Sequence, residues 1–295
     1  MNELDFIEAL KILSKDKEIS LNFTDDAAIL GEYIISKDIL IEDVHFIYKN
    51  NLNDIIFKAV TSNVSDIAAM GGTAKYILAG FGLSQKIDKK ELIDSLKNVL
   101  DFYDLDLIGG DTSFSEKLFI SITVIGTKNK YLLKRSGAKS GDLVCISRPV
   151  GYAKKYLEEE LAGKNENRHY KFTAETKLGE YLGNHEGVTS CTDISDGLGV
   201  DTDSIAKASS KKIVLSKEKL LELSPDLPIE DVLSSGEEYA LLFTVNPTYF
   251  ENLSKNAPKK FYHIGFVKEG NGAYLIDEKN LINISAFGFT HKFYR

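Results

Sequence analysis

The first half of the chain alternates apolar stretches of two kinds, which predict helices and strands in turn. Apolar residues every three or four positions predict helices over 2–15, from Asn53 to Gly71-Gly72, and from Asp88 to Tyr103. Short apolar runs predict strands over 27–30, 33–36, 39–41, 75–82, 105–108 and 118–125. Asn53 can cap the second helix, and Asp88 with Glu91 forms a capping-box pattern for the third.

The second half repeats this alternation. We predict strands at 143–147, up to Asp193, and near 212–215, 239–245 and 262–267, and helices over 150–161, 173–184 and after Gly197. Between the halves, the basic, glycine-containing stretch 133–141 suits a linker, so we place two domains at 1–134 and 135–295. Alternating helices and strands indicate α/β or α+β layers, not a helical bundle or a β-sandwich.

Composition and charge argue against several classes of protein. The 295 residues are 43% hydrophobic and 27% charged, ordinary for a globular protein, and the net charge of −8 disfavours a protein that coats nucleic acid. Only two cysteines are present, too few for a disulfide framework. The acidic N-terminus does not resemble a signal peptide and the apolar runs are short, so we expect a cytoplasmic protein without a membrane partner.

Candidate chemistry lies in aspartates that are set among small or apolar residues. Such carboxylates occur at Asp25-Asp26, Asp38, Asp66, Asp111, Asp193 and Asp196. A carboxylate in such a setting must be hydrogen-bonded, protonated or metal-bound. Oxygen ligands without histidine or cysteine favour magnesium or calcium over zinc, and divalent cations would let an acidic site bind a polyphosphate. The P-loop and dinucleotide motifs are absent, and the spacing after Asp193 does not fit the twelve-residue calcium loop.

Each of these motifs also has a simpler explanation, because aspartate before alanine or glycine often caps a helix or closes a turn. The glycines of Gly109-Gly110 would allow a phosphate to approach the backbone, but this signal is weak alone. Arg135 could bind phosphate oxygens through its planar guanidinium group, although an exposed linker arginine fits the composition equally well.

Seven ordered motifs together resemble the thiamine-monophosphate kinase family of the aminoimidazole-ribonucleotide synthetase superfamily. They are Thr24–Leu30, Ser36–Asp38 with Val44–Phe46, Asn63–Gly71, Gly109–Thr112, Arg135–Ala138, Asp193–Leu198 and Ser235–Phe243. Ile264-Gly265 and Gly288–His291 close the pattern. The resemblance implies a two-domain fold in which the N-terminal domain forms a dimer-interface β-barrel and the C-terminal domain is α/β. It also implies a homodimer.

The resemblance further implies magnesium-dependent, in-line transfer of the ATP γ-phosphate to thiamine monophosphate. Such an acceptor phosphate is already anionic, so alignment and charge neutralisation matter more than a strong base. Several magnesium ions would be held by Asp26, Ser36, Asp38, Asp66, Asp111, Asp193 and Asp196. The catalytic residues would be Asp111 and Asp196, the ATP ligands Gly110, Asp111, Arg135 and Ser195, and the thiamine phosphate ligands His45, Glu237 and Phe289.

Three positions depart from the family pattern. Thr24 stands where relatives usually have glycine, Lys37 where they have threonine, and 172–175 lacks their Pro-x-Pro-Arg sequence. Lysine at 37 could displace a cation or contact a phosphate. Two alternatives stay open. An ATP-dependent enzyme of the cyclo-ligase type would share the aspartates but use a different acceptor, and a magnesium–ATP sensor without catalysis is favoured by Lys37 and the altered segment. The cysteines expected of selenophosphate synthetases or hydrogenase-maturation relatives are absent.

Overall fold

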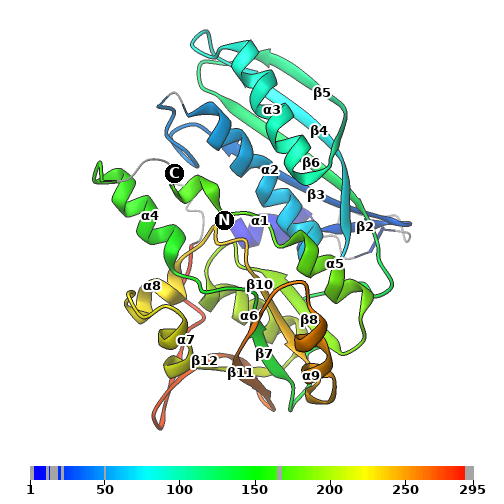
Figure 1. Ribbon diagram of the computed structural model, residues 1–295, viewed down its shortest axis with the longest axis vertical. Coiled ribbons are helices and arrows are strands. Elements are labelled where there is room, and N and C mark those ends of the chain that lie inside the picture. Colours follow the sequence, from blue (N-terminus) through cyan, green and yellow to red (C-terminus); the bar gives the residue numbers. More distant parts are fainter. Residues whose placement is uncertain are drawn as a thin grey trace.

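The chain folds around two open β-sheets, one from each half of the sequence (Figure 1). This computed structural model describes residues 3–10, 13, 19–20, 23–49, 51–164 and 168–289. The elements of the first half are α1 (Glu3–Leu10), β1 (Ile19–Ser20), β2 (Ala28–Leu30), β3 (Tyr33–Ile41), α2 (Leu52–Ala69), β4 (Thr73–Leu83), α3 (Lys89–Tyr103), β5 (Asp106–Phe114) and β6 (Phe119–Thr127). The predicted helix over 2–15 is thus seen as α1, and its remainder falls largely outside the described residues.

The first sheet is an open sheet and not the predicted barrel. Its six strands run in the order β1-β2-β3-β6-β4-β5, and all neighbours are antiparallel except the parallel pair β4–β5. Within the described residues, β5 pairs with β4 and does not pair back to β1, so the sheet does not close. The described residues of one chain therefore do not form the expected N-terminal β-barrel.

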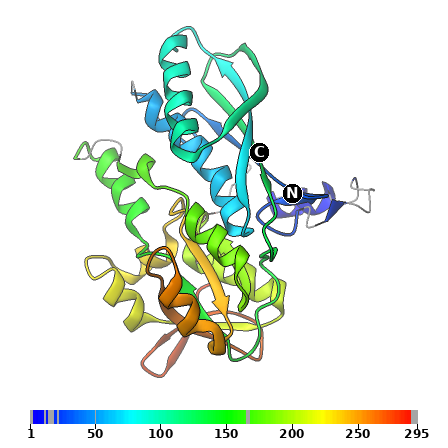
Figure 2. The same cartoon turned by 45° about the vertical axis from the view of Figure 1, so that its right-hand side comes forward.

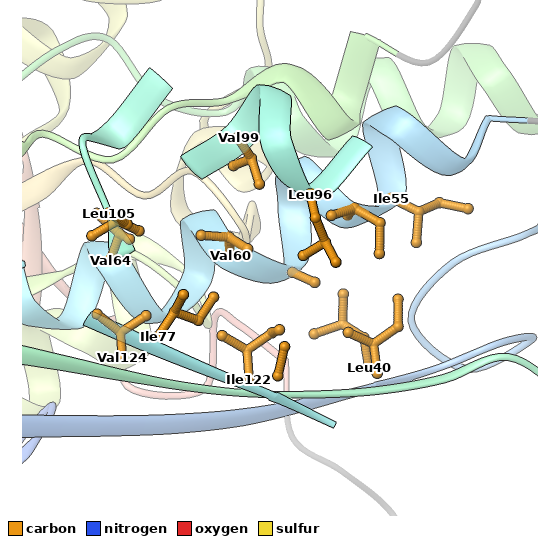
Figure 3. Close-up of a cluster of buried hydrophobic side chains, with 14 of the residues drawn as sticks. Leu40, Ile55, Val60, Val64, Ile77, Leu96, Val99, Leu105, Ile122 and Val124 are labelled. Atoms are coloured by element: carbon orange, nitrogen blue, oxygen red, sulfur yellow. The ribbon is translucent and has the colours of Figure 1, made fainter. Parts of the chain in front are cut away.

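One face of this sheet is covered by α2 and α3, and the core lies between them (Figure 3). Val60 and Val64 of α2 face the sheet residues Ile77 and Ile122, and all four are at most 1% exposed. Burying such aliphatic side chains contributes roughly 1.5–3 kcal/mol each. Helix α2 is buried along most of its length, because other segments also pack on the sides that the sheet leaves uncovered.

The second sheet has seven strands in the order β13-β12-β9-β11-β7-β10-β8, and only β9–β12 is parallel. Its strands are β7 (Leu143–Ile146), β8 (Val188–Asp193), β9 (Lys212–Ser216), β10 (Leu241–Val245), β11 (Tyr262–Lys268), β12 (Gly272–Asp277) and β13 (Asn280–Asn283). Its helices are α4 (Tyr152–Leu161), η2 (Arg168–Lys171), α5 (Thr176–Asn184), α6 (Leu198–Ser209), α7 (Lys217–Leu223), α8 (Ile229–Ser234) and α9 (Pro247–Asn256). Mixed, mainly antiparallel sheets make the α+β alternative the correct class.

Several predicted elements differ in extent. The strands expected at 33–36 and 39–41 form one strand, β3, because its buried side chains alternate through the polar centre. Strand β5 runs through Gly109-Gly110-Asp111, which was expected to lie between two strands. Asn53 does not cap α2, because the helix already begins at Leu52 and its cap position is Asn51. Asp88 does cap α3, accepting from the amides of Lys90 and Glu91.

The two halves meet where α5 packs against the C-terminal end of α2 (Figures 1 and 2). Two glycines of α5 allow backbone contact: a Cβ at Gly183 would lie 2.0 Å from the carbonyl oxygen of Gly71, and one at Gly179 would lie 2.4 Å from that of Ala68. Around this contact, Ala69 joins a core cluster with Leu178 and other residues of the second half. The junction therefore fixes α2 relative to the second sheet. The division at 134/135 stays a prediction, and the two sheets lie on either side of it.

The segment 172–175, which departs from the family pattern, is held by ion pairs. Glu175 is 6% exposed and pairs with Arg148 at 3.0 Å and with Lys259 at 2.7 Å. The Arg148 guanidinium also donates to the carbonyl oxygen of Thr173 at 2.8 Å. The altered sequence is thus matched by a charge network within the second half. Among the described residues, no helix is long and apolar enough to span a bilayer.

Replacing Gly183 with alanine should destabilise the protein, because the added Cβ would meet the backbone of Gly71 and the two halves would have to move apart. Overpacking of this kind costs about 1–3 kcal/mol. Urea unfolding of G183A should show this loss. K177A, which changes an exposed position of the same helix, should unfold within about 0.5 kcal/mol of the wild type. Equal stability of both variants would contradict the tight α2–α5 junction.

Candidate functional site

The candidate site lies where α2 crosses the centre of β3. Ser36 and Asp38 share one face of β3, the face toward α2, because alternate residues of a strand point the same way. Ser36 Oγ donates to Asp66 Oδ2 of α2 at 2.5 Å and to Asn63 Oδ1 at 3.2 Å. Burial raises the pKa of the Asp38 carboxyl group, and the Ser62 side chain, also on α2, partly offsets this shift. The site therefore begins as a polar seam within an otherwise apolar helix–sheet contact.

Two more aspartates come to this seam from other parts of the chain. Asp26 precedes β2, and Asp193 ends β8 of the second sheet. Asp26, Asp66 and Asp193 each place a carboxylate oxygen within 4.8 Å of the other two. Ser65 Oγ donates to Asp193 Oδ2 at 2.6 Å. Helix α2 therefore makes hydrogen bonds with residues of both halves of the chain.

Burial and mutual repulsion raise the pKa values of these carboxyl groups. The pKa of Asp66 is raised strongly, first by burial and then by the charges of Asp38, Asp193 and Asp26. Burial, followed by the charge of Asp26, raises the pKa of Asp193 to about 7. The neighbouring Asp25 has its pKa raised to about 6, again mainly by burial. The cluster is therefore short of positive charge.

Arg135 supplies part of that charge. Its guanidinium donates to Asp26 Oδ1 through Nε at 3.1 Å and Nη2 at 2.6 Å, and its backbone amide donates to Asp25 Oδ1 at 2.8 Å. Asp26 has a side chain 0% exposed, whereas that of Arg135 is 28% exposed. Arg135 is thus part of the site and not a free linker residue. One side of it remains open to a ligand.

The donor set fits divalent cations that prefer oxygen. Within the part of the chain that the structure describes, two oxygens of the cluster, Asp26 Oδ2 and Asp193 Oδ1, are buried without a hydrogen-bond partner. Unpaired buried carboxylate oxygens are costly, and one cation between them would compensate both. Carboxylates alone, without imidazole or thiolate, are the ligands of magnesium or calcium.

Lys37 does not enter this cluster. It points to the opposite face of β3 from Ser36 and Asp38, and its Nζ donates to Ser121 Oγ of β6 at 2.6 Å. The lysine that departs from the family pattern therefore does not occupy the place of a cation.

The loop after β8 brings Ser195 and Asp196 close to the cluster. Asp201 of α6 orders this loop, since its Oδ2 accepts from the amides of Asp196 at 3.2 Å and Gly197 at 3.0 Å. Asp196 itself is exposed, three residues beyond the buried Asp193. It borders the site without joining the three closest carboxylates.

Gly110 and Asp111 lie elsewhere in this chain. Asp38 pairs across the sheet with Ile122, Ile122 with Ala79 and Ala79 with Gly110. That is three strand spacings, roughly 14 Å. A Cβ at Gly110 would lie 1.8 Å from the carbonyl oxygen of Ala79, so strand packing alone requires this glycine. Asp111 is exposed on β5 and accepts a hydrogen bond from the amide of Thr112.

The residues expected to meet the acceptor form a second group. His45 and Glu237 are joined by Lys58, whose Nζ lies 2.9 Å from the His45 carbonyl oxygen and 2.6 Å from Glu237 Oε1. The amide of Phe289 donates to the carbonyl oxygen of Asp196 at 2.8 Å, and its side chain is 57% exposed. Thr290 and His291 of the closing motif lie outside the described residues.

Sequence reasoning missed several residues of the site. Asp25 was a candidate carboxylate but was not assigned as a ligand. The other residues that were not singled out are Ser65, Thr192, Asp201 and Lys58. Thr192 Oγ1 donates to Asp26 Oδ1 at 2.8 Å. Most of them adjoin a predicted aspartate in the sequence, which was the available signal. Lys58 had none, because a lysine inside an amphipathic helix usually faces solvent.

The chain is similar to known proteins over most of its length. Residues 24–127 match the family model described as AIR synthase related protein, N-terminal domain. The chain is 34% identical to the thiamine-monophosphate kinase of Pyrococcus horikoshii over 79% of this chain and 78% of that protein. It is 30% identical to that of Aquifex aeolicus over 95% of each. A solved structure described as AaThiL complexed with AMPPCP and TMP is 28% identical, with a TM-score of 0.84 over 99% of this chain and 97% of that chain.

The buried carboxylates should make the protein's stability depend on pH when divalent cations are removed. Because the pKa of Asp193 rises from 3.8 to about 7 on folding, the folded chain keeps a proton that the unfolded chain loses between about pH 4 and 7. The free energy of unfolding in EDTA should therefore fall as pH rises through this range. D193N, which cannot ionise, should be more stable than the wild type at pH 8 by about 2 kcal/mol.

Urea unfolding in EDTA at pH 5 and pH 8 measures this difference. The control is D94N, which alters an aspartate 58% exposed on α3. We expect D94N to follow the wild-type pH profile. A D193N protein less stable than the wild type at pH 8 would contradict the strained carboxylate cluster.

Proposed function

This chain belongs to the thiamine-monophosphate kinase family, and we propose that it phosphorylates thiamine monophosphate with ATP, using magnesium held by the aspartate cluster. The observation that carries the proposal is the convergence of Asp26, Asp66 and Asp193 from both halves of the chain. A related structure is described as complexed with AMPPCP and TMP, which supports a nucleotide and an acceptor as the two substrates.

The metal ligands in this proposal are Asp26, Asp66 and Asp193, with Ser36 and Asp38 beside them and Asp196 at the edge. Bound magnesium ions would neutralise phosphate charge. The chain's own residues supply the alignment. Helix α2 carries both Asp66 and Ser65. The Ser65 hydroxyl donates a hydrogen bond to Asp193 and so holds this residue of the second half in place. In-line transfer depends on such fixed placement more than on a strong base, because the acceptor oxygen is already anionic.

The nucleotide and the acceptor would approach from different sides of the cluster. Arg135 and Ser195 lie beside the carboxylates from the second half, which suits the ATP phosphates. Glu237 is 38% exposed, so its carboxylate is within reach of the cationic thiazolium ring of the acceptor. Phe289 offers an exposed aromatic face for the same cation.

Removing one cluster carboxylate should abolish transfer without unfolding the protein. D66N keeps the side-chain volume but removes a ligand charge, so we expect at least about a 100-fold loss of kcat. The measurement is formation of thiamine diphosphate and ADP from thiamine monophosphate, ATP and magnesium. D54N, at the start of the same helix, should retain wild-type activity. EDTA should stop the wild-type reaction.

Three outcomes of this assay distinguish the kinase from the two alternative functions. One ADP per thiamine diphosphate supports the kinase. Binding of ATP without turnover would favour a sensor, and ADP release without thiamine diphosphate would favour another ATP-dependent enzyme of the superfamily. Either of the last two would overturn the proposal.

We also propose that the chain forms a homodimer through the open edge of the first sheet. Strand β5 forms this edge and is exposed throughout its length (Figure 1). It carries Leu107, Ile108 and Phe114, which are 50%, 53% and 72% exposed. An exposed apolar edge strand invites pairing with another chain. The proposed ATP-binding roles of Gly110 and Asp111, which lie on this strand, would then depend on the partner that covers it.

Placing a charge on this edge should prevent association. L107E should elute as a monomer in size-exclusion chromatography with light scattering, whereas the wild type should elute as a dimer. I93E alters an equally accessible apolar residue on α3, 64% exposed, and should leave the dimer intact. A dimeric L107E protein would place the interface elsewhere.

A further inference from the structure

Lys58 is a buried cation at the junction of the two halves. It comes from α2, the helix that also carries Asp66, and its side chain is only 3% exposed. Lysine is almost never buried without a partner, since an unpaired ammonium group in a protein interior is costly. The role of this residue therefore has to be found in the groups around it.

Those groups come from both halves. The Lys58 ammonium lies 2.6 Å from Glu237 Oε1, 2.9 Å from the carbonyl oxygen of His45 and 5.5 Å from the ring centre of Tyr170. His169 is also near, and burial together with the charge of Lys58 lowers its pKa to about 4. His169 is thus neutral around pH 7, and Glu237 is the anion that Lys58 meets directly.

Glu237 is held in an uncommon conformation. Its φ of 57° lies in the left-handed region, which side chains other than glycine seldom adopt. Its backbone amide donates to the carbonyl oxygen of Ser195 at 2.7 Å, which ties it to the loop of Asp196. Residues are kept in such conformations where the surroundings fix them, often at functional sites. Lys58 fixes the carboxylate end of the same residue.

His45 is held in a similar way. Its Nδ1 accepts from the amide of Ile41 at 3.0 Å, and its own amide donates to the carbonyl oxygen of Ile41 at 2.9 Å. The Lys58 ammonium group donates a hydrogen bond to the carbonyl oxygen of His45. One ammonium group therefore connects a turn of the first half to a loop of the second.

We propose that Lys58 is a positioning residue for thiamine monophosphate, acting from beneath the site through Glu237 and His45. The difference in exposure supports this role: the Glu237 side chain is 38% exposed and accessible to a ligand, whereas the Lys58 side chain is 3% exposed. Lys58 directs the carboxylate toward the thiazolium cation and offsets its repulsion of the acceptor phosphate. This inference rests on the proposed function and adds a residue to it.

The test compares K58M, E237Q and the double variant K58M/E237Q by steady-state kinetics with both substrates. K58M should raise the KM for thiamine monophosphate at least tenfold and leave the KM for ATP within twofold. In the E237Q background the same substitution should raise the KM for thiamine monophosphate by a smaller factor than in the wild type, because the part of its effect that passes through Glu237 is already lost. K217M breaks a more exposed ion pair of similar length, Lys217–Asp277 at 2.7 Å, in the second half, and should change neither KM.

The outcomes separate this inference from the proposed function. A wild type that makes no thiamine diphosphate would overturn both. An active wild type in which K58M shifts both KM values equally, or shifts the KM for thiamine monophosphate equally in the E237Q background, would overturn the role of Lys58 alone. If K58M does not fold, E237Q carries the test: it should show the selective KM increase, and an unchanged KM for thiamine monophosphate would refute the proposal.

Discussion

Mutual repulsion among buried carboxylates is the constraint on which this structure depends. Asp66 is buried beside Asp26, Asp38 and Asp193, and each of these charges raises its pKa further. A cluster of this kind is unfavourable unless protons, hydrogen-bond donors or cations compensate it. The chain supplies Arg135 and several hydroxyl donors, yet two oxygens of the cluster still lack partners among the described residues. The fold thus keeps a place for positive charge, and binding cations there would also stabilise it.

Helix α2 fixes the positions of the residues that form this carboxylate cluster. It is buried on the first sheet by its apolar side chains, and its C-terminal end contacts the glycines of α5. Its polar residues then meet partners from both halves: Asp66 meets Ser36, Ser65 meets Asp193, and Lys58 meets Glu237. A rigid helix that is packed on both sides can hold these groups in register, which is what in-line transfer between two phosphates requires.

Much of the site could be predicted from the sequence because aspartates in apolar surroundings are conspicuous. Asp26, Asp66 and Asp193 were all predicted as ligands, and the structure brings them together. Asp111 has similar neighbours in the sequence, yet it lies on the edge strand β5. This position could not be predicted, because local sequence does not tell which strand of a sheet is central. The sheet of one chain does not close into the expected barrel for a related reason: closure depends on strand order, which no local pattern encodes. Lys58 could not be found at all, because its burial comes from segments distant in sequence.

The most direct test of this account is a crystal structure with Mn²⁺ and a non-hydrolysable ATP analogue, with the metal located by anomalous scattering. We expect manganese ions within about 2.0–2.3 Å of carboxylate oxygens of Asp26, Asp66 and Asp193 and of the nucleotide phosphates. Metal bound only to the nucleotide, with no ion between these aspartates, would contradict it.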